Sequence, residues 1–156
     1  MAEKTSQARR IRQSGVGSIP DDRQGVGLIL PFKIKENLIL NQFYEKPFAR
    51  SVFWQDWNEI NARAEKQMET FDIRAAGIDT VVGTLSGGNQ QKVVVGRELS
   101  VPLKLLIAAQ PTRGVDFASA SSIQQKIIAA ADQGTSVLLI SSDLDELLNT
   151  ADRVMV

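Results

Sequence analysis

The last third of the chain has the clearest hydrophobic pattern. Two continuous apolar runs, LKLLIAAQ at 103–110 and TSVLLIS at 135–141, have the length and composition of buried strands in a parallel sheet. Between them, isoleucines recur on one helical stripe, which predicts a helix over 119–132, and Gly134 follows it as a stop. The pattern therefore predicts a strand, a helix and a second strand in succession.

The segment after the second apolar run predicts one more helix and one more strand. In SSDLDELLNTAD, Ser142 and Asp145 have the spacing of a capping box at a helix start. RVMV at 153–156 has the composition of a third strand. Alternating strands and helices predict an α/β fold with a parallel sheet. The helix would direct four apolar residues at helical spacing toward the core: Leu144, Leu147, Leu148 and Ala151.

The earlier part of the chain is predicted to be mainly helical. Residues 15–20 form a short strand that ends at Pro20, and 20–27 is rich in Pro, Asp and Gly, as in a loop. IKENLIL at 34–40 predicts a short helix, and a longer helix is predicted over 59–71 with Asn58 as its N-cap. The longer helix has four residues on one face: Ile60, Ala64, Met68 and Phe71.

Two segments are not decided by local pattern. Most aromatic residues lie within 41–57, where they either pack an irregular segment, the favoured interpretation, or form a binding platform. VVVGREL at 93–99 carries three β-branched residues that favour a strand, and Gly96 weakens a helix further. The aromatic residues concerned are Phe43, Tyr44, Phe48, Phe53, Trp54 and Trp57.

Composition restricts the chemistry more than the fold. The 156 residues carry 18 Lys plus Arg against 18 Asp plus Glu, so no basic excess points to nucleic acid as a partner. The sequence has no cysteine and no histidine, which excludes thiolate catalysis and disulfides and removes the commonest general base and metal ligand. The N-terminal sequence lacks the apolar core of a signal peptide, and no stretch is long and apolar enough to span a bilayer.

TLSGGNQQKV at 84–93 is the candidate for anion binding. Two glycines precede an apolar stretch, and such a loop at a helix start offers backbone N–H groups to an anion. The triplet Ser86-Gly87-Gly88 alone could also be a plain turn in which Ser86 is the N-cap. An independent phosphate loop would need a basic residue beside this helix start, and Lys92 is the nearby candidate.

The longer string LSGGNQQK resembles the signature motif of ATP-binding cassette (ABC) ATPases. Further strings follow that family's order: IPDDRQGVGLIL with KENLIL around the Q-loop, LLIAAQPTRGVD at the Walker B strand and D-loop, and LLISSDLDELLNTADRVMV at the switch-loop region. The resemblance covers roughly residues 11–156 and implies a helix over 93–99. PTRG (111–114) and IPDDR (19–23) make the chain most similar to the second cassette of tandem subunits that serve ribose-like sugars and nucleosides.

The sequence departs from the family where an ABC ATPase hydrolyses its own nucleotide. No G-x-x-x-x-G-K-[ST] string occurs, so the Walker A loop would lie upstream of residue 1. Ala109 and Gln110 stand where the family has the Walker B aspartate that organises Mg²⁺ and the glutamate that polarises the attacking water. Gln110 can orient a water but cannot accept its proton. Ser142 stands at the switch-histidine position.

The Q-loop position is also altered. It falls at about Pro20–Asp21, and the Q-loop-like residues Pro20, Asp21 and Asp22 include no glutamine. Together these differences predict a degenerate catalytic site with no metal-binding residues. Ala109 would serve as strand packing and Ser142 as a helix cap.

The intact signature implies a role in trans. In ABC dimers this motif faces the γ-phosphate of ATP held by the partner's Walker A loop. Asp116 matches the D-loop aspartate, which helps to align the opposite site, and it can also cap the following helix. ATP and Mg²⁺ would be held mainly by the partner cassette, and none is expected tightly bound to this chain alone. The residues implied for ATP binding in trans are Leu85, Ser86, Gly87, Gly88 and Gln90.

The resemblance also implies an organisation along the chain. Residues 1–14 are a polar lead-in, 15–33 a strand with the Q-loop-like segment, 34–100 a helical subdomain with the signature motif, and 101–156 an α/β core piece. Because a small parallel sheet would leave an edge open, we expect a fragment of a larger protein that could self-associate through that edge.

The resemblance implies a cytoplasmic protein, peripheral on the inner face of the cell membrane. The expected partners are a second cassette, a transmembrane permease whose coupling helix would dock on about 20–57, and indirectly a substrate-binding protein. Three hypotheses follow: an ABC-importer ATPase fragment acting in trans, a non-catalytic interaction module, or an unrelated α/β protein that uses the Ser-Gly-Gly loop for its own anion. Whether the chain alone is an enzyme stays open, because it lacks Walker A.

Overall fold

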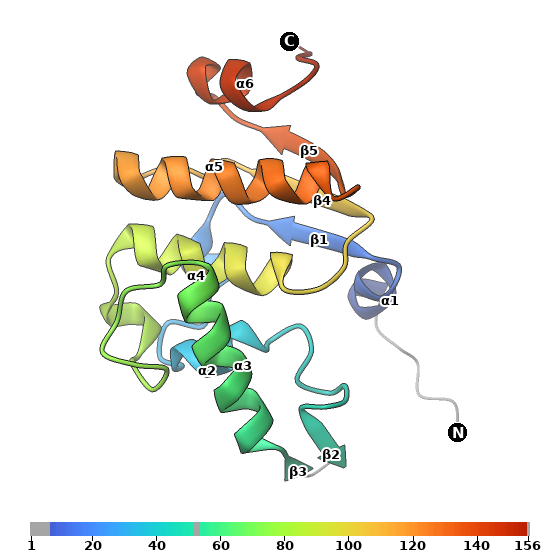
Figure 1. Ribbon diagram of the computed structural model, residues 1–156, viewed down its shortest axis with the longest axis vertical. Coiled ribbons are helices and arrows are strands. Elements are labelled where there is room, and N and C mark those ends of the chain that lie inside the picture. The colour runs from blue at the N-terminus through green and yellow to red at the C-terminus, as the bar shows by residue number, and fades with distance from the viewer. Residues whose placement is uncertain (1–6, 52–53, 156) are drawn as a thin grey trace.

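The computed structural model describes residues 7–51 and 54–155, which form a small parallel sheet and a set of helices beside it (Figure 1). The sheet has the strand order β1 (Val16–Ile19), β4 (Leu105–Ala109) and β5 (Ser136–Ile140). All its pairs are parallel, with Val16 opposite Leu105 and Leu105 opposite Ser136. The predicted α/β class with a parallel sheet is confirmed, as are these three predicted strands.

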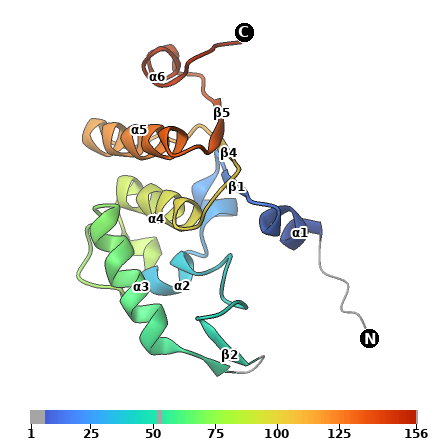
Figure 2. The same ribbon diagram turned by 45° about the vertical axis from the view of Figure 1, so that its right-hand side comes forward.

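The helices occupy both sides of this sheet. In Figure 2, α4 (Gly87–Leu99) and α5 (Phe117–Asp132) lie on one side and α1 (Gln7–Gln13) on the other. Below α4 lie α2 (Ile34–Leu38) and α3 (Trp57–Thr70), with the short strands β2 (Ala49–Ser51) and β3 (Trp54–Gln55) at the far end (Figure 1). None of the helices within 7–51 and 54–155 is long and apolar enough to cross a membrane.

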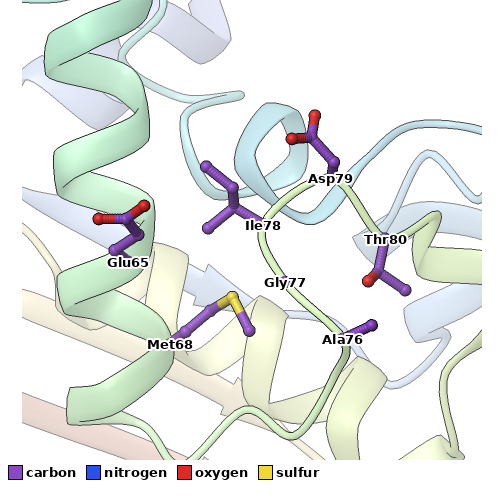
Figure 3. Close-up of a pocket in the computed structure, with 7 residues that line it drawn as sticks. All are labelled: Glu65, Met68, Ala76, Gly77, Ile78, Asp79 and Thr80. Atoms are coloured by element: carbon purple, nitrogen blue, oxygen red, sulfur yellow. The ribbon is translucent and has the colours of Figure 1, made fainter.

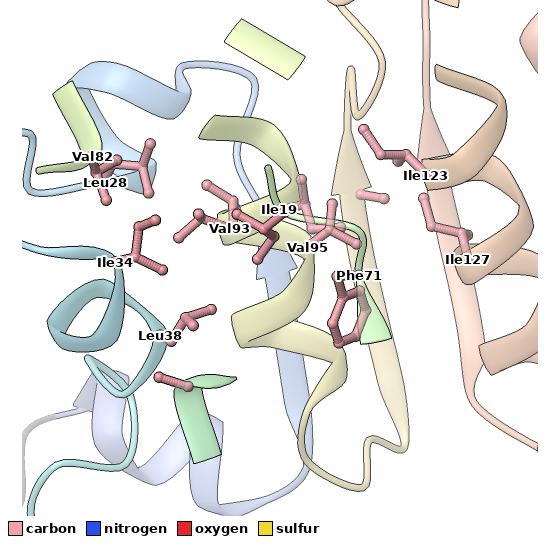
Figure 4. Packing of buried hydrophobic residues seen from close by; sticks show 14 of the residues in the cluster. Ile19, Leu28, Ile34, Leu38, Phe71, Val82, Val93, Val95, Ile123 and Ile127 are labelled. Atoms are coloured by element: carbon pink, nitrogen blue, oxygen red, sulfur yellow. The ribbon is translucent and has the colours of Figure 1, made fainter. Parts of the chain in front are cut away.

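Helix α4 forms the centre of the core, which settles the ambiguous segment at 93–99. Val93, Val94 and Val95 are all buried, and side chains from β1, α2 and α5 gather around them (Figure 4). Burial on several sides outweighs the weak helix propensity of valine. Gly96 has a packing reason as well, because a Cβ there would lie 3.1 Å from the ring of Phe71. The predicted helix is therefore confirmed.

The face predicted for the helix over 59–71 is also confirmed. Ala64 and Phe71 are buried in the main cluster, against which Met68 packs, and Ile60 is buried in a second, smaller cluster. The predicted cap is wrong, however, because the helix starts earlier. The Oδ1 atom of Asp56 accepts hydrogen bonds from the backbone N–H groups of Asn58 and Glu59, so Asp56 is the N-cap.

The aromatic segment packs only in part. Phe48 is buried with Ile39 and Ile60, as a packing role predicts. Phe43, Trp54 and Trp57 are exposed, and Lys35 lies 5.3 Å from the ring of Trp57. Phe53 lies outside the described residues. Packing therefore accounts for Phe48 in the middle of the segment, whereas Phe43 before it and Trp54 and Trp57 after it are in contact with solvent.

The C-terminal part differs most from the prediction. Residues 153–155 form no strand. Leu138 and Ile140 of β5 are about half exposed, because they lie on the face opposite Val137 and Leu139, which pack against the core. Helix α6 (Leu144–Thr150) exposes Leu144 and Leu148, which were predicted to face the core. Its buried residue is instead Glu146.

The remaining differences concern turns. The predicted capping role of Ser142 is wrong, because Asp143 accepts the N–H groups of Asp145 and Glu146 and is the N-cap of α6. Within the predicted loop 20–27, a single π-helical turn, η1 (Arg23–Gly27), forms. Gly134 ends α5 as predicted, with φ of +95°, a value that favours glycine.

Candidate functional site

The signature loop consists of Leu85 and Ser86, which lie between a short 3₁₀ turn, η2 (Val82–Thr84), and α4. Ser86 is exposed and is the N-cap of α4. Its Oγ accepts hydrogen bonds from the backbone N–H of Asn89 at 3.4 Å and from the Asn89 side-chain amide at 3.0 Å. Since both bonds use the lone pairs of the hydroxyl, its proton stays available to donate outward. Ser86 thus caps the helix and can also contact a ligand.

Gly88 allows the start of α4 to pack against the start of α5. A Cβ at this position would lie 2.4 Å from the Oγ of Ser119 and 2.8 Å from the Oδ2 of Asp116. Real Cβ atoms do not approach other atoms so closely, so only glycine permits this contact between the two helix starts. The predicted signature and D-loop segments therefore lie directly against each other, although they are far apart in sequence.

Asp116 caps α5, as one of its two predicted roles requires. Its Oδ1 accepts the backbone N–H of Ser119 at 3.0 Å, and its Oδ2 accepts the Ser119 hydroxyl at 2.7 Å. These two bonds, the backbone bond first, hold the pKa of the Asp116 carboxyl below its ordinary value of 3.8. The carboxylate is exposed and stays charged next to the signature loop, so it could also contact a partner molecule.

Acid is expected to release this cap at a pH below the ordinary carboxyl range. Because the folded pKa of Asp116 is lowered, its contribution to stability is present above the unfolded value near 3.8 and is lost as the pH falls through the folded pKa. NMR of the Ser119 amide during acid titration would show a transition below pH 3.8 that Asp116→Asn abolishes. A midpoint at or above 3.8 would contradict the assigned hydrogen bonds.

Gln90 occupies a different place from the one expected for a nucleotide contact. It is 2% exposed, and its Nε2 donates to the carbonyls of Val82 and Leu85, each at 3.3 Å. Its Oε1 accepts from the side-chain amide of Gln24 at 2.9 Å. Gln90 therefore fixes the backbone leading into the signature loop from inside. A direct bond to a nucleotide would require these inward bonds to break.

Two residues that the sequence analysis did not single out also contact this region. Arg23 of η1 donates from Nη1 to the carbonyl of Arg113 at 2.7 Å and from Nη2 to the carbonyl of Gly114 at 3.3 Å. Gln91 of α4 donates to the carbonyl of Pro111 at 2.8 Å. Both residues hold the PTRG turn, residues 111–114, against the signature helix. Both lie in strings that carry the family resemblance, but their role could not be predicted, because the acceptors are backbone atoms distant in the chain.

The three positions predicted to form a degenerate catalytic site lie together at the carboxyl ends of β4 and β5. Ala109 is the last residue of β4, and Gln110 has an unusual backbone φ of +49°. The N–H of Gln110 donates to the carbonyl of Ile140 at 2.7 Å, and its side-chain Oε1 accepts from the Ser142 hydroxyl at 3.3 Å. Within the described chain, no group of three or more acidic residues could hold a metal ion. This pair can orient a water but holds no general base.

The Q-loop-like residues form the turn that carries Arg23. Asp22 is the N-cap of η1, and its Oδ1 accepts from the N–H groups of Gln24 at 3.1 Å and Gly25 at 2.9 Å. Asp21 accepts the N–H of Asp22 at 2.9 Å, and Pro20 directly follows β1. Both carboxylates are exposed and are used for local backbone bonds, so their direct role here is to shape the turn.

The Lys92 ammonium binds Asp72 instead of an anion at the signature loop. It is 6% exposed, and its Nζ bonds the carbonyl of Asp72 at 3.0 Å and the carboxylate of Asp72 at 2.8 Å. The Lys92 ammonium, followed by the Arg74 guanidinium, lowers the pKa of Asp72. Asp72 occupies the turn after α3 with φ of +49°. The hypothesis of an independent phosphate loop therefore loses its basic residue.

A separate shallow pocket of about 590 Å³ lies between α3 and the loop 76–80 (Figure 3). Its walls combine the apolar side chains of Met68 and Ile78 with the carboxylates of Glu65 and Asp79. No Lys or Arg is among the residues lining it, and Asp79 already binds Lys33 and Lys35 at 2.8 and 2.9 Å. The lining offers no basic side chain to a phosphate, and the two lysines beside it are already paired with Asp79, so the pocket has no feature of a nucleotide site.

Comparison with solved structures defines the class of protein. The chain superimposes with a TM-score of 0.71 and 22% identity on the dimeric structure of a bacterial ABC transporter cassette, covering 93% of this chain and 60% of that one. A post-hydrolysis dimer of an ATP-binding cassette with bound ADP and Pi gives the same score over 92% of this chain. The fold is that of an ABC ATPase cassette.

Comparison by sequence then finds relatives that are named as import ATP-binding proteins. It is 43% identical over 148 residues to the nucleoside import ATP-binding protein NupA of Lactococcus lactis, and 42% identical over 149 residues to the guanosine import ATP-binding protein NupO of Bacillus subtilis. It is 41% identical over 142 residues to the ribose import ATP-binding protein RbsA of Hahella chejuensis. No protein-family model matches the chain.

These matches cover 91–95% of this chain and only 28–29% of the relatives. The chain thus spans less than a third of the length of the curated relatives it matches. It is homologous to part of the ATP-binding subunits of ABC importers for nucleosides and sugars.

Proposed function

We propose that this chain supplies its signature loop in trans to ATP held by a second cassette, as part of an ABC importer for nucleosides or simple sugars. One observation carries the proposal: Ser86 and Asp116 are both exposed, and Gly88, two residues after Ser86, packs directly against Asp116, whereas Ala109, Gln110 and Ser142 offer no carboxylate. An intact signature beside a degenerate catalytic site fits a cassette that completes a partner's site. The nucleoside and sugar substrates come from the names of the homologues.

The residues at the site have separate tasks in this proposal. The Ser86 hydroxyl donates to a phosphate oxygen, and the first-turn N–H groups of α4 with the helix dipole favour negative charge in front of it. Asp116 aligns the facing loop of the partner. ATP with Mg²⁺, held mainly by the partner, supplies the phosphoryl group for hydrolysis. Gln110 orients a water on this chain's own side but cannot take its proton, so hydrolysis belongs to the partner site.

The proposed partners include a transmembrane permease, which would hold the chain on the cytoplasmic face of the membrane, and indirectly a substrate-binding protein. Exposed apolar side chains support a docking role for about 20–57, since Val26 is 74% and Trp54 is 73% exposed. Ile29, Phe32 and Trp57 are also exposed along this stretch. The balance of basic and acidic residues gives no support for a nucleic-acid partner.

Ser86→Ala is expected to lower phosphate release by the partner cassette roughly 10- to 100-fold, because one hydrogen bond to a charged oxygen is lost. The assay mixes this chain with the Walker A-bearing cassette of its transporter and Mg-ATP. Ser14→Ala is the control, since Ser14 is an exposed serine at the end of α1 that bonds the carbonyl of Ile11. If the two variants give the same rate of phosphate release, the proposed role of Ser86 in trans is wrong.

A non-catalytic interaction module is the second candidate, and the uncharged Ala109, Gln110 and Ser142 positions favour it. Isothermal titration of the isolated chain with Mg-ATP tests where the nucleotide is held. We expect no saturable binding up to about millimolar ATP. Tight binding by the isolated chain would contradict the proposal that the partner holds the nucleotide. If the chain binds its partner cassette but leaves its hydrolysis unchanged, the interaction module is the better description.

A further inference from the structure

We propose that Arg23 is a positioning residue that fixes the signature loop relative to the PTRG turn. The proposal rests on the proposed trans function, because the loop that Arg23 positions is the one assigned to the partner's ATP. Arg23 belongs to η1, more than sixty residues before the signature motif. It contacts both the PTRG turn and the first residue of α4, so a single guanidinium joins three segments of the chain.

Two carbonyls of the PTRG turn accept the guanidinium. Nη1 donates to Arg113 at 2.7 Å and Nη2 to Gly114 at 3.3 Å. Gly114 has φ of +66°, which directs the turn and favours glycine. Because a guanidinium is a rigid planar fork, two bonds to successive carbonyls fix its orientation as well as its position. A lysine has the charge but a single donor centre, so it would not reproduce this geometry.

The same guanidinium lies against the signature loop. A Cβ on Gly87 would be 2.7 Å from Nη2 of Arg23 and 3.3 Å from the carbonyl oxygen of Gly114. Gly87 is the first residue of α4 and directly follows Ser86. The absence of a side chain on Gly87 thus leaves the space that the guanidinium occupies. Movement of Arg23 would reach Ser86 through one intervening residue.

Gln24 secures the other side of the loop. Its amide donates to Gln90 at 2.9 Å, and Gln90 in turn donates to the carbonyl of Leu85, the residue before Ser86. The turn η1 is itself anchored, because the buried Arg97 donates from Nη1 to the carbonyl of Gly27 at 2.8 Å. Adjacent side chains on an anchored turn therefore hold the signature loop from two directions.

The arrangement makes a specific prediction about how Arg23 acts. If Arg23 positions the loop, its loss weakens the alignment of Ser86 with a phosphate and lowers the turnover number of the partner site. Affinity for ATP changes little, since the partner holds most of the nucleotide. If Arg23 acted only through its positive charge, a lysine would preserve activity. The Nε of Arg23 is buried and makes no hydrogen bond within the described chain, so the terminal nitrogens make the contacts.

The test compares Arg23→Lys and Arg23→Gln in the mixed assay with the Walker A-bearing cassette and Mg-ATP. We expect both to lower kcat about tenfold while KM for ATP stays within about twofold. Arg10→Gln, which removes a charge from an exposed position on α1, is the control and should leave both constants unchanged. Thermal melting of each variant confirms that equal amounts of folded chain are compared.

The outcomes separate this inference from the proposed function. Ser86→Ala is measured in the same series. If Ser86→Ala lowers kcat but the Arg23 variants do not, Arg23 has no positioning role and the trans function stands. If Arg23→Lys retains full activity while Arg23→Gln does not, charge alone matters and the positioning role is overturned. If Ser86→Ala also leaves kcat unchanged, the proposed trans function is wrong, and the positioning role of Arg23, which rests on it, is wrong as well.

Discussion

Replacement of Gly88 by alanine is expected to lower the free energy of unfolding by about 1–3 kcal/mol and to abolish most of the partner's stimulated hydrolysis. The new Cβ would lie 2.4 Å from Oγ and 3.0 Å from Cβ of Ser119, and 2.8 Å from Oδ2 of Asp116. Ser119 is buried and Asp116 is bonded to it, so neither side chain can rotate away without breaking the hydrogen bonds that cap α5. The start of α4 must therefore move away from α5, which displaces Ser86 from Asp116.

The glycines of the chain provide matched controls for this substitution. A Cβ on Gly77 would meet nothing within 4 Å, so Gly77→Ala should leave stability and hydrolysis unchanged. Gly87→Ala should be intermediate, because its closest neighbour is the end of the Arg23 side chain, which can shift. Urea denaturation and phosphate release measure the two effects. Equal stability of Gly88→Ala and Gly77→Ala would mean that the contact between α4 and α5 is not close-packed.

Glu98→Ala is expected to lower the free energy of unfolding by about 3–5 kcal/mol. The Glu98 carboxylate is fully buried in α4 and accepts bonds from two arginines. Arg12 donates from both terminal nitrogens at 2.9 and 3.2 Å, and Arg97 donates from Nε at 2.9 Å. The backbone N–H of Ser18 in β1 adds a fourth bond at 3.2 Å. Removal of Glu98 would leave the buried Arg97 charge without its carboxylate partner.

Glu69→Ala is the matched control, since Glu69 is an exposed glutamate in the last turn of α3. Its replacement should change the free energy of unfolding by less than about 0.5 kcal/mol. Guanidinium chloride is unsuitable as the denaturant because it screens ion pairs, so urea melts at low and high salt are preferable. If Glu98→Ala and Glu69→Ala unfold at the same urea concentration, the buried network contributes nothing to stability.

The sequence predicted the central part of this molecule because its signals are local or belong to a specific motif. The apolar runs around Leu106 and Leu138 became strands, and the stripe through Ile123 and Ile127 became a buried helical face. The string LSGGNQQK identified the family, which the homologues and the cassette fold confirm. The family resemblance also predicted a helix at 93–99, where the propensity of valine alone favours a strand.

Other features depend on contacts that no local pattern reveals. Asp56 and Asn58 are both residue types that favour the N-cap position, so local sequence does not show which of them caps α3. The path of the chain before α3 makes Asp56 the N-cap. The direction of the Gln90 side chain is set by the carbonyls of Val82 and Leu85, which local sequence does not reveal, and its contact with a nucleotide stays a prediction. The exposed Leu144 and Leu148 show that helical spacing indicates an apolar face but not what covers it.

The arrangement of the sheet has a consequence for how the chain folds. β1 pairs with β4, with Val16 opposite Leu105, so the entire stretch from η1 to α4 lies between two neighbouring strands. Closing so long a loop costs entropy before any strand pairing compensates for it. The contacts of α2 and α3 with α4 span shorter sequence distances. We therefore expect the helices around α4 to assemble first and to bring β1 and β4 together, so that β1–β4 pairing limits the folding rate.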